Sequence, residues 1–310
     1  MRADFDRKRR LKWYKSKIIT EIIPPFRDLE VKMRLAVRLL VALNLGFVLL
    51  LSLSGSIGGV IGEIIYILAF ALPVFLGGAA AARLRREREA VAGVSEENFS
   101  GFGISGRGAA RLLPLIAPTV SIVLLLSFLT SLILNKLGLS GAEVADEPLL
   151  KMLLIHALVP AVLEELTFRY IPIKLLYPYS PRWCVIYSAL FFALIHCDLY
   201  KMPYAFVAGV IFVTVDIMLD SVLPSVILHF LNNLSSVLYI KYGELQGFSL
   251  WYFLSLGTLT AVSVVVLIAM RKKYREGLSL ALKKGSPESD GSPLALIILC
   301  LGVALTNLFL

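Results

Sequence analysis

The sequence predicts an all-α fold, a polytopic transmembrane helix bundle of eight or nine helices. Of its 310 residues, 58% are hydrophobic and only 17% are charged, and the mean hydropathy is +0.80. Soluble domains are about half apolar and about a quarter charged. About 20 apolar residues cross the ~30 Å of bilayer hydrocarbon. The candidate spans are approximately 35–53, 57–82, 112–134, 149–168, 183–197, 203–219, 222–240, 248–270 and 293–310.

Lysine and arginine residues alternate between basic-rich and basic-poor regions along the chain. The basic-rich regions, which hold 27 of the 31 Lys and Arg residues, are 1–38, 83–111, 169–182 and 271–284. The basic-poor loops contain only Lys136, Lys151, Lys201 and Lys241. Because cytoplasmic loops carry the excess of Lys and Arg, we predict a multi-pass protein of the cell membrane with a cytoplasmic N-terminus. The net charge of +9 therefore indicates topology in a lipid bilayer, and not nucleic-acid binding.

Two parts of the chain differ in polarity. Residues 1–34 are predicted to form a basic cytoplasmic or interfacial segment, and residues 35–310 a transmembrane domain. Within that domain the region of about 149–240 is the most polar, and it contains all three histidines. Polar groups inside a bilayer are costly and usually face a cavity or one another. We therefore expect the functional core of the domain to be this region, arranged around a wet cavity.

The first motif in this core is EExxxR, formed by Glu164, Glu165 and Arg169. On a helix, Glu165 and Arg169 are i,i+4 neighbours in the favourable order for an ion pair. Glu164 points about 100° away and has no obvious local counter-charge, which suits a carboxylate acting as a general base. The alternative is that both acids lie solvated at the end of a helix.

The other two motifs supply histidines. FxxxH places Phe192 and His196 on one helix face, where a lone histidine is often only a packed core residue. HxxxN places His229 and Asn233 one turn apart, so that both can donate hydrogen bonds toward a developing oxyanion. Hydrogen bonding between helices of the bundle is the alternative for this pair.

The spacing of the motifs indicates that they meet at one depth. We expect a turn at 178–182, centred near Ser180, with Glu164 16 residues before it and His196 16 residues after it. A second turn near 221–224 would return His229 and Asn233 to the same level. This alignment assumes mostly continuous helices, and Pro172 is a candidate kink.

The ordered set of three motifs resembles the CAAX protease and bacteriocin-processing family, which includes the type II CAAX prenyl endopeptidases. The resemblance covers about 149–240. It implies a glutamate-dependent intramembrane endopeptidase with its catalytic core there. By this resemblance Glu164 activates a water molecule, His196 holds or polarises it, and His229 with Asn233 stabilises the oxyanion. Glu165, Arg169 and Phe192 would support the site, and the substrate would be a membrane-tethered peptide or protein, with prenylated CAAX sequences as one class.

Other chemistries remain open from the sequence. Glu164, His196 and His229 would also form a His₂Glu zinc set, although Asn233 fits oxyanion donation better and we favour a metal-free site without a cofactor. Cys197, next to His196, raises the possibility of a thiol enzyme. Buried Glu, His and Asp also mark transporters and proton relays, and a non-catalytic membrane scaffold is a further alternative.

Overall fold

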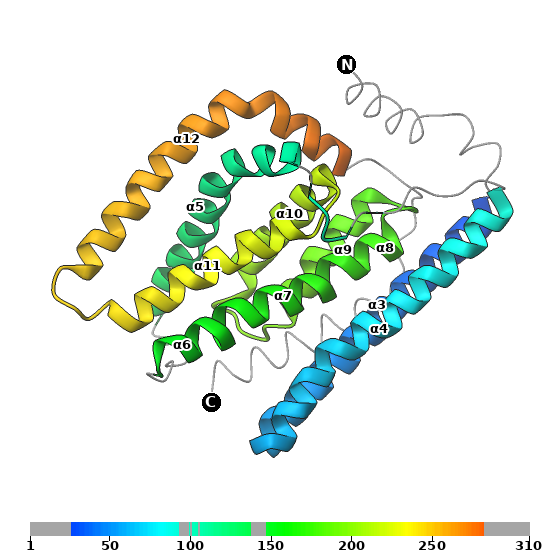
Figure 1. Cartoon of the computed structure of the whole chain (residues 1–310), viewed down its shortest axis with the longest axis horizontal. Helices are drawn as coiled ribbons and strands as arrows, with labels where there is room; N and C mark the ends of the chain where they lie inside the picture. Colours follow the sequence, from blue (N-terminus) through cyan, green and yellow to red (C-terminus); the bar gives the residue numbers. More distant parts are fainter. Residues whose placement is uncertain (1–25, 93–98, 100, 105, 138–146, 282–310) are drawn as a thin grey trace.

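The computed structural model describes residues 26–281 except 93–98, 100, 105 and 138–146 (Figure 1). The described chain is all α-helical and forms eight helical rods, which confirms the predicted fold class. The rods are α3 (Phe26–Ile57), α4 (Gly59–Ala92), α5 (Gly106–Lys136), the continuous run from α6 to α8 (Leu149–Leu176), α9 (Pro181–Leu194), α10 (Met202–Leu219), α11 (Leu223–Tyr242) and α12 (Phe248–Ala281). The expected ninth span, 293–310, lies outside the described residues, as do residues 1–25 of the N-terminal segment.

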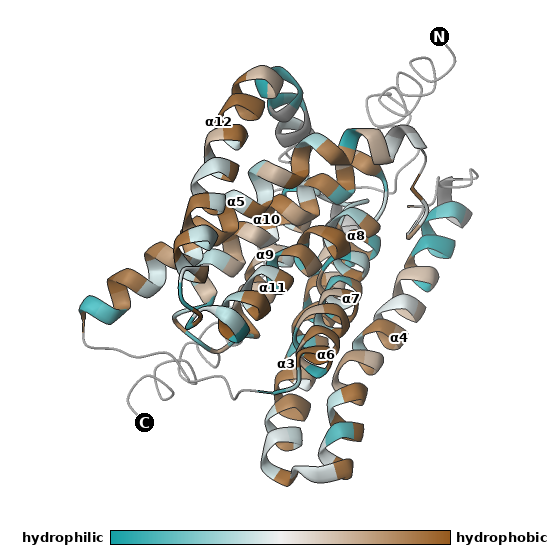
Figure 2. Ribbon diagram, turned by 60° about the vertical axis from the view of Figure 1, so that its left-hand side comes forward, coloured by the Kyte–Doolittle hydropathy of each residue, from teal (hydrophilic) through white to brown (hydrophobic). Residues whose placement is uncertain are grey.

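Within the described residues, six helices are long and apolar enough to cross a membrane: α3, α4, α5, α10, α11 and α12. Brown, hydrophobic residues are frequent along α3 and α4, and teal residues gather toward the upper end of α4 (Figure 2). The outer surface of α12 is especially apolar, with exposed residues such as Trp251, Val265 and Ile268. Such a surface is suited to acyl chains and not to water, so the chain is a multi-pass membrane protein.

The rod from residue 149 to 176 is a helix interrupted twice by π-helical turns. In chain order it consists of α6 (Leu149–Met152), η1 (Leu153–Leu158), α7 (Val159–Glu165), η2 (Leu166–Tyr170) and α8 (Ile171–Leu176). Pro172 has no N–H to donate to the carbonyl of Phe168, four residues earlier. The hydroxyl of Ser188 on α9 donates a hydrogen bond to that carbonyl. The carbonyl that Pro172 leaves without its helical donor is therefore hydrogen-bonded by the neighbouring helix. Single π-helical turns within α-helices are frequent at functional sites.

Both predicted turns occur where expected. Ser180 is the N-cap of α9, and its side chain accepts a hydrogen bond from the backbone N–H of Trp183. Pro181 occupies the first helical position. Asp220 ends α10 in the left-handed conformation, with φ of 56°, which Asp tolerates better than most residues. These turns place the middle of α7 beside the first half of α11.

Helices α9 and α10 approach each other closely at Gly209. A Cβ atom at this position would lie 2.7 Å from the Cα of Ala189 and 3.0 Å from its Cβ. Small residues of this kind allow membrane helices to pack backbone against backbone. This contact holds α9, which carries the FxxxH motif, against α10, which leads into the helix of the HxxxN motif.

We expect Gly209→Val to lower the free energy of unfolding by about 1–3 kcal/mol, since overpacking must separate the two helices. The measurement is thermal unfolding in detergent micelles. Gly257→Val on α12 is the matched control, because a Cβ there meets no atom within 4 Å. Equal thermal midpoints for the two variants would contradict this packing role.

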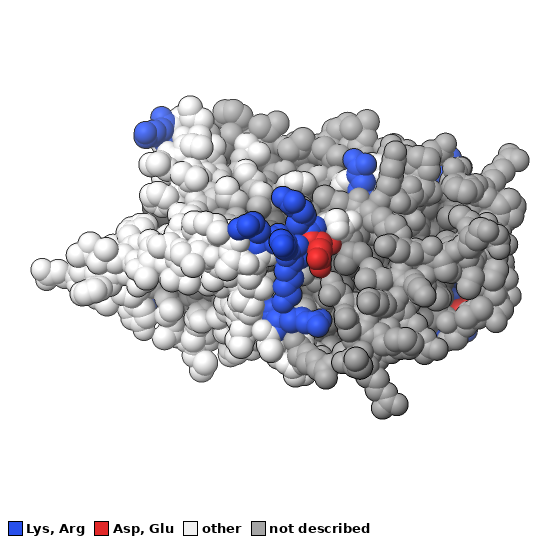
Figure 3. Space-filling view, turned by 90° about the horizontal axis from the view of Figure 1, so that it is seen from above, with Lys and Arg blue, Asp and Glu red and all other residues white. Residues whose placement is uncertain are grey.

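Successive rods reverse direction, so the basic-rich regions meet at one end of the bundle. At this end α4 and α12 finish with Arg83 to Arg88 and Arg271 to Arg275, and α5 begins near Arg111. Lys and Arg side chains gather near the middle of the face seen from above, next to a small acidic patch (Figure 3). The opposite end has Lys136, Lys151, Lys201 and Lys241 near its helix termini. The basic-rich and basic-poor regions of the sequence therefore lie at opposite ends of the fold.

Candidate active site

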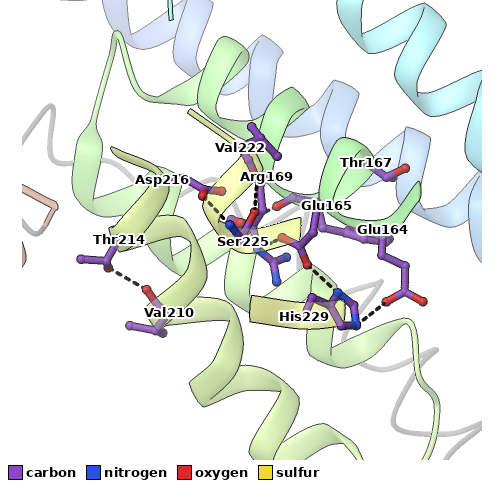
Figure 4. A network of polar contacts seen from close by, with 12 residues as sticks. Glu164, Glu165, Thr167, Arg169, Val210, Thr214, Asp216, Val222, Ser225 and His229 are labelled. Carbon is purple, nitrogen blue, oxygen red and sulfur yellow. Dashed lines mark hydrogen bonds and ion pairs between the residues drawn. The ribbon is translucent and has the colours of Figure 1, made fainter. Parts of the chain in front are cut away.

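A polar cluster is buried where α7 and η2 meet α11. Glu164 and Glu165 occupy the last turn of α7, and Arg169 follows in η2. Their side chains, together with His229 of α11, converge in Figure 4. Ionisable groups at membrane depth occur where they pair with one another or line a functional path.

Glu165 is the centre of this cluster. Its Oε1 lies 2.8 Å from Nδ1 of His229, and its Oε2 lies 3.0 Å from Nε of Arg169. The Arg169 contact is an ion pair by distance, although neither of those two atoms has hydrogen-bond geometry. Both partners are 0% exposed, so the expected i,i+4 ion pair is confirmed. Because an ionised carboxylate can only accept, the contact with Glu165 places a proton on Nδ1 of His229, and an imidazolium would carry a second donor proton on Nε2.

Arg169 is also enclosed by aromatic rings. Its guanidinium carbon lies 4.0 Å from the ring centroid of Phe192 and 5.5 Å from that of Phe212. A guanidinium is weakly hydrated and stacks on aromatic faces, which makes it the cation best suited to such a dry place. Phe192 therefore contacts the cluster directly, and its supporting role in the site remains a prediction.

Glu164 faces the other side of the same imidazole. Its Oε2 lies 3.9 Å from Nε2 of His229, too far for a hydrogen bond, and its side chain is 13% exposed. Within the described part of the chain, this buried oxygen has no hydrogen-bond partner. The two glutamates thus have different surroundings: the oxygens of Glu165 face His229 and Arg169 at 2.8 and 3.0 Å, while Oε2 of Glu164 lies 3.9 Å from the imidazole of His229 without a hydrogen bond.

His196 reaches the cluster from just beyond the end of α9. The predicted span of 183–197 is longer than the observed helix, which ends at Leu194. The reason is local: Cys197 has a φ of 45°, and the amides of His196 and Cys197 bond carbonyls only three residues back. The imidazole of His196 still packs on Phe192, with ring centroids 5.3 Å apart. The ring centroid of Phe192 also lies 5.5 Å from that of His229, so Phe192 packs between the two histidines.

Asn233 lies one helical turn after His229 on α11 and is half-buried. Its Oδ1 accepts a 3.4 Å hydrogen bond from the side chain of Asn232. The structure thus gathers Glu164, Glu165, Arg169, Phe192, His196 and His229 through recorded contacts, and sets Asn233 on the same helix as His229.

Several residues near the cluster carry no sequence motif and were not predicted. Asp216 of α10 is fully buried and accepts a hydrogen bond from Ser225 of α11. The phenols of Tyr66 on α4 and Tyr204 on α10 lie within electrostatic reach of Glu164. The only signal in the sequence was the presence of these polar residues inside apolar spans, which does not identify their partners.

Metal binding was tested against the same geometry. In residues 26–281, outside the gaps given above, no group of three or more His, Cys, Asp or Glu side chains is arranged to hold a metal ion. His156 takes no part in the cluster, because its side chain is 46% exposed and lies 3.4 Å from Glu147. The absence of a cofactor remains a prediction.

Comparison with known proteins adds independent information about this region. A search of curated proteins and a search of solved structures gave no match. A family profile described as "Type II CAAX prenyl endopeptidase Rce1-like" matches residues 146–235. That stretch contains all three motifs and every residue of the buried cluster described above. Membership of this family implies a peptidase, and residues 146–235 of the chain are a domain of the Rce1-like type II CAAX prenyl endopeptidase family.

Proposed function

We propose that this protein is an intramembrane endopeptidase in which Glu164 activates a water molecule to hydrolyse a peptide bond. The observation that carries the proposal is the placement of Glu164 Oε2, a buried acceptor 3.9 Å from His229 Nε2 inside an apolar helix bundle. A carboxylate is an effective general base when it is positioned and shielded from water. Glu165 and Arg169 hold His229 in place from the opposite side of the ring.

The other site residues have roles that follow from their positions. His196 orients the attacking water, and His229 with Asn233 donates to the oxyanion of the tetrahedral intermediate. Such donors are most effective when they are fixed before the charge develops. The residues act in a polar cavity within the catalytic core, about 149–240, of a transmembrane domain of 35–310, preceded by a basic segment of 1–34.

The substrate in this proposal is a membrane-tethered peptide or protein, including prenylated CAAX-type sequences. A site at membrane depth suits a cleavage point that is held near lipid by a prenyl chain or a helix. The family match supports a protein substrate. The basic end of the bundle is the cytoplasmic end by the positive-inside rule, which gives a cytoplasmic N-terminus.

The test is to incubate purified protein in detergent with farnesylated and unprenylated CAAX peptides, with wild type beside Glu164→Ala. We expect the wild type to release the C-terminal tripeptide from the farnesylated peptide, and Glu164→Ala to release none. Equal cleavage by Glu164→Ala would show that the activity comes from another group or from a contaminant. Equal rates on both peptides would remove the prenyl requirement and keep the peptidase.

Cys197 provides a test against a thiol mechanism. We expect Cys197→Gly to retain activity within about twofold, because the thiol is not used and because Gly adopts positive φ without strain. The measurement is kcat on the farnesylated peptide, together with thermal unfolding, where the variant should be at least as stable as wild type. Loss of cleavage in a folded Cys197→Gly protein would favour a nucleophilic cysteine.

A chelation experiment tests the metal-free site. We expect dialysis against 1,10-phenanthroline to leave the cleavage rate within about twofold of the untreated protein, since hydrolysis needs no Lewis acid when a general base and oxyanion donors are in place. Loss of activity with recovery on adding Zn²⁺ would instead assign Glu164, His196 and His229 as metal ligands.

A further inference from the structure

Asp216 is a fully buried carboxylate that belongs to none of the three motifs. It lies on α10, and its Oδ1 accepts a hydrogen bond of 3.1 Å from the backbone N–H of Ser225 (Figure 4). Its Oδ2 is buried and has no hydrogen-bond partner among the described residues. A buried carboxylate is costly unless it is compensated, so its surroundings need an explanation.

Ser225 lies in the first turn of α11, where backbone N–H groups have no partner within the helix. The donors of this turn are all accounted for. The N–H of Leu223 bonds the Ser221 hydroxyl at 3.2 Å, Pro224 has no N–H, and the N–H of Ser225 bonds Asp216. A carboxylate at a helix N-terminus also interacts favourably with the helix dipole. Asp216 therefore caps α11 from a different helix.

This cap lies one turn before His229. Ser225 and His229 are i,i+4 neighbours and share a face of α11, and both are buried. The hydroxyl of Ser225 donates a hydrogen bond to the carbonyl of Val222 in the same turn, and Glu165 bonds Nδ1 of His229 one turn later. A shift of the first turn of α11 would therefore change the distance between His229 and both glutamates.

Helix α10 also contacts the site through Arg169. The guanidinium of Arg169 pairs with Glu165, and its carbon lies 5.5 Å from the ring centroid of Phe212, one turn before Asp216 on α10. Its stacking on Phe192 and Phe212 limits how far it can move. Helix α10 thus contacts the polar cluster in two places, at Arg169 through Phe212 and at the first turn of α11 through Asp216.

We propose that Asp216 is a positioning residue that sets the placement of His229 by capping the first turn of α11. Asp216 does not touch the reacting atoms in this account. The activity part of the proposal rests on the peptidase function proposed above, while the structural part does not depend on it.

The direct test uses the histidines, because the chain has only three. Protein labelled with ¹⁵N-histidine in detergent micelles gives ring resonances that can be assigned by substitution of each residue. We expect Asp216→Ala to move the His229 resonances and to leave those of His156, at the far end of the bundle, unchanged. Asp216→Asn keeps an acceptor oxygen for the Ser225 N–H and should hold the His229 resonances near their wild-type positions.

Thr214→Val is the matched control. Thr214 is another buried polar residue of α10, but its hydroxyl bonds only the carbonyl of Val210 on its own helix. This variant should leave all histidine resonances in place. Unchanged His229 resonances in Asp216→Ala would overturn the proposal. So would an equal movement of the His156 resonances, or an Asp216→Asn variant as perturbed as Asp216→Ala.

The same variants have a kinetic readout on the farnesylated peptide. We expect Asp216→Ala to lower kcat at least about tenfold with KM within about twofold, because small misplacements of a reacting group are costly. Asp216→Asn and Thr214→Val should keep kcat within about threefold. Wild-type kcat in Asp216→Ala would contradict the proposal. If the wild type itself cleaves no peptide, the peptidase function fails, and the NMR comparison still decides whether Asp216 positions His229.

Discussion

Glu164→Gln should reduce peptide cleavage by at least about 10³-fold without lowering stability. A positioned general base contributes about 10²- to 10⁴-fold to rate, and an amide of the same shape cannot take the proton of water. The thermal midpoint should be no lower than that of the wild type, because the replaced carboxylate is mostly buried and has an oxygen without a hydrogen bond. Single-turnover cleavage of the farnesylated peptide and thermal unfolding in micelles measure the two quantities.

The matched control for this substitution is Glu147→Gln. Glu147 pairs with Lys151 at 2.6 Å and with His156 at 3.4 Å, away from the cluster. Its replacement should leave cleavage within about twofold of wild type, because general-base catalysis needs a group within reach of the reacting water. Substantial activity in Glu164→Gln, or an equal loss in Glu147→Gln, would show that the base is not Glu164.

Arg169→Met should have the largest effect on stability. Removing one partner of a buried ion pair leaves the other charge uncompensated and costs about 3–5 kcal/mol. Here both Arg169 and Glu165 are 0% exposed, and Met keeps an unbranched apolar chain against Phe192. We expect cleavage to be lost as well, because Glu165 can no longer hold His229 in a defined position. The measurement is unfolding of the protein in mixed micelles with increasing SDS.

A double variant separates stability from catalysis. Glu165→Gln combined with Arg169→Met removes both charges, and Gln can still accept the hydrogen bond from Nδ1 of His229. The double variant should recover at least half of the stability lost in Arg169→Met, because no uncompensated Glu165 carboxylate remains. Its cleavage should stay well below that of the wild type. A double variant no more stable than Arg169→Met alone would contradict the ion-pair explanation.

Local patterns were sufficient to predict the all-α architecture and the contacts within single motifs. The apolar runs predicted the helices, and the turn residues at Ser180 and near Ser221 predicted where helices end. Both features depend on residues that are close in sequence. The ion pair of Glu165 with Arg169 followed from i,i+4 spacing alone. Phe192 and His196 also pack against each other, as their spacing indicated, although the helix ends two residues before the histidine.

The remaining features depend on contacts between distant elements. The π-helical turns of the 149–176 rod involve packing and the bond from Ser188 to Phe168, which no local spacing encodes. The sharing of His229 between Glu164 and Glu165 needs the relative rotation of α7 and α11. Asp216 has no motif, because its partner Ser225 lies across a turn on another helix. Each of these is a tertiary property that sequence periodicity leaves open.

The central claim is that the buried Glu164 and His229 hydrolyse peptides and do not conduct protons. Its most direct test is to reconstitute the purified protein into liposomes and to follow farnesylated-peptide cleavage and proton flux in the same vesicles. We predict cleavage that disappears in Glu164→Gln, with proton flux equal to that of empty liposomes. Proton flux that depends on Glu164, in vesicles that cleave no peptide, would contradict the claim and establish a proton relay.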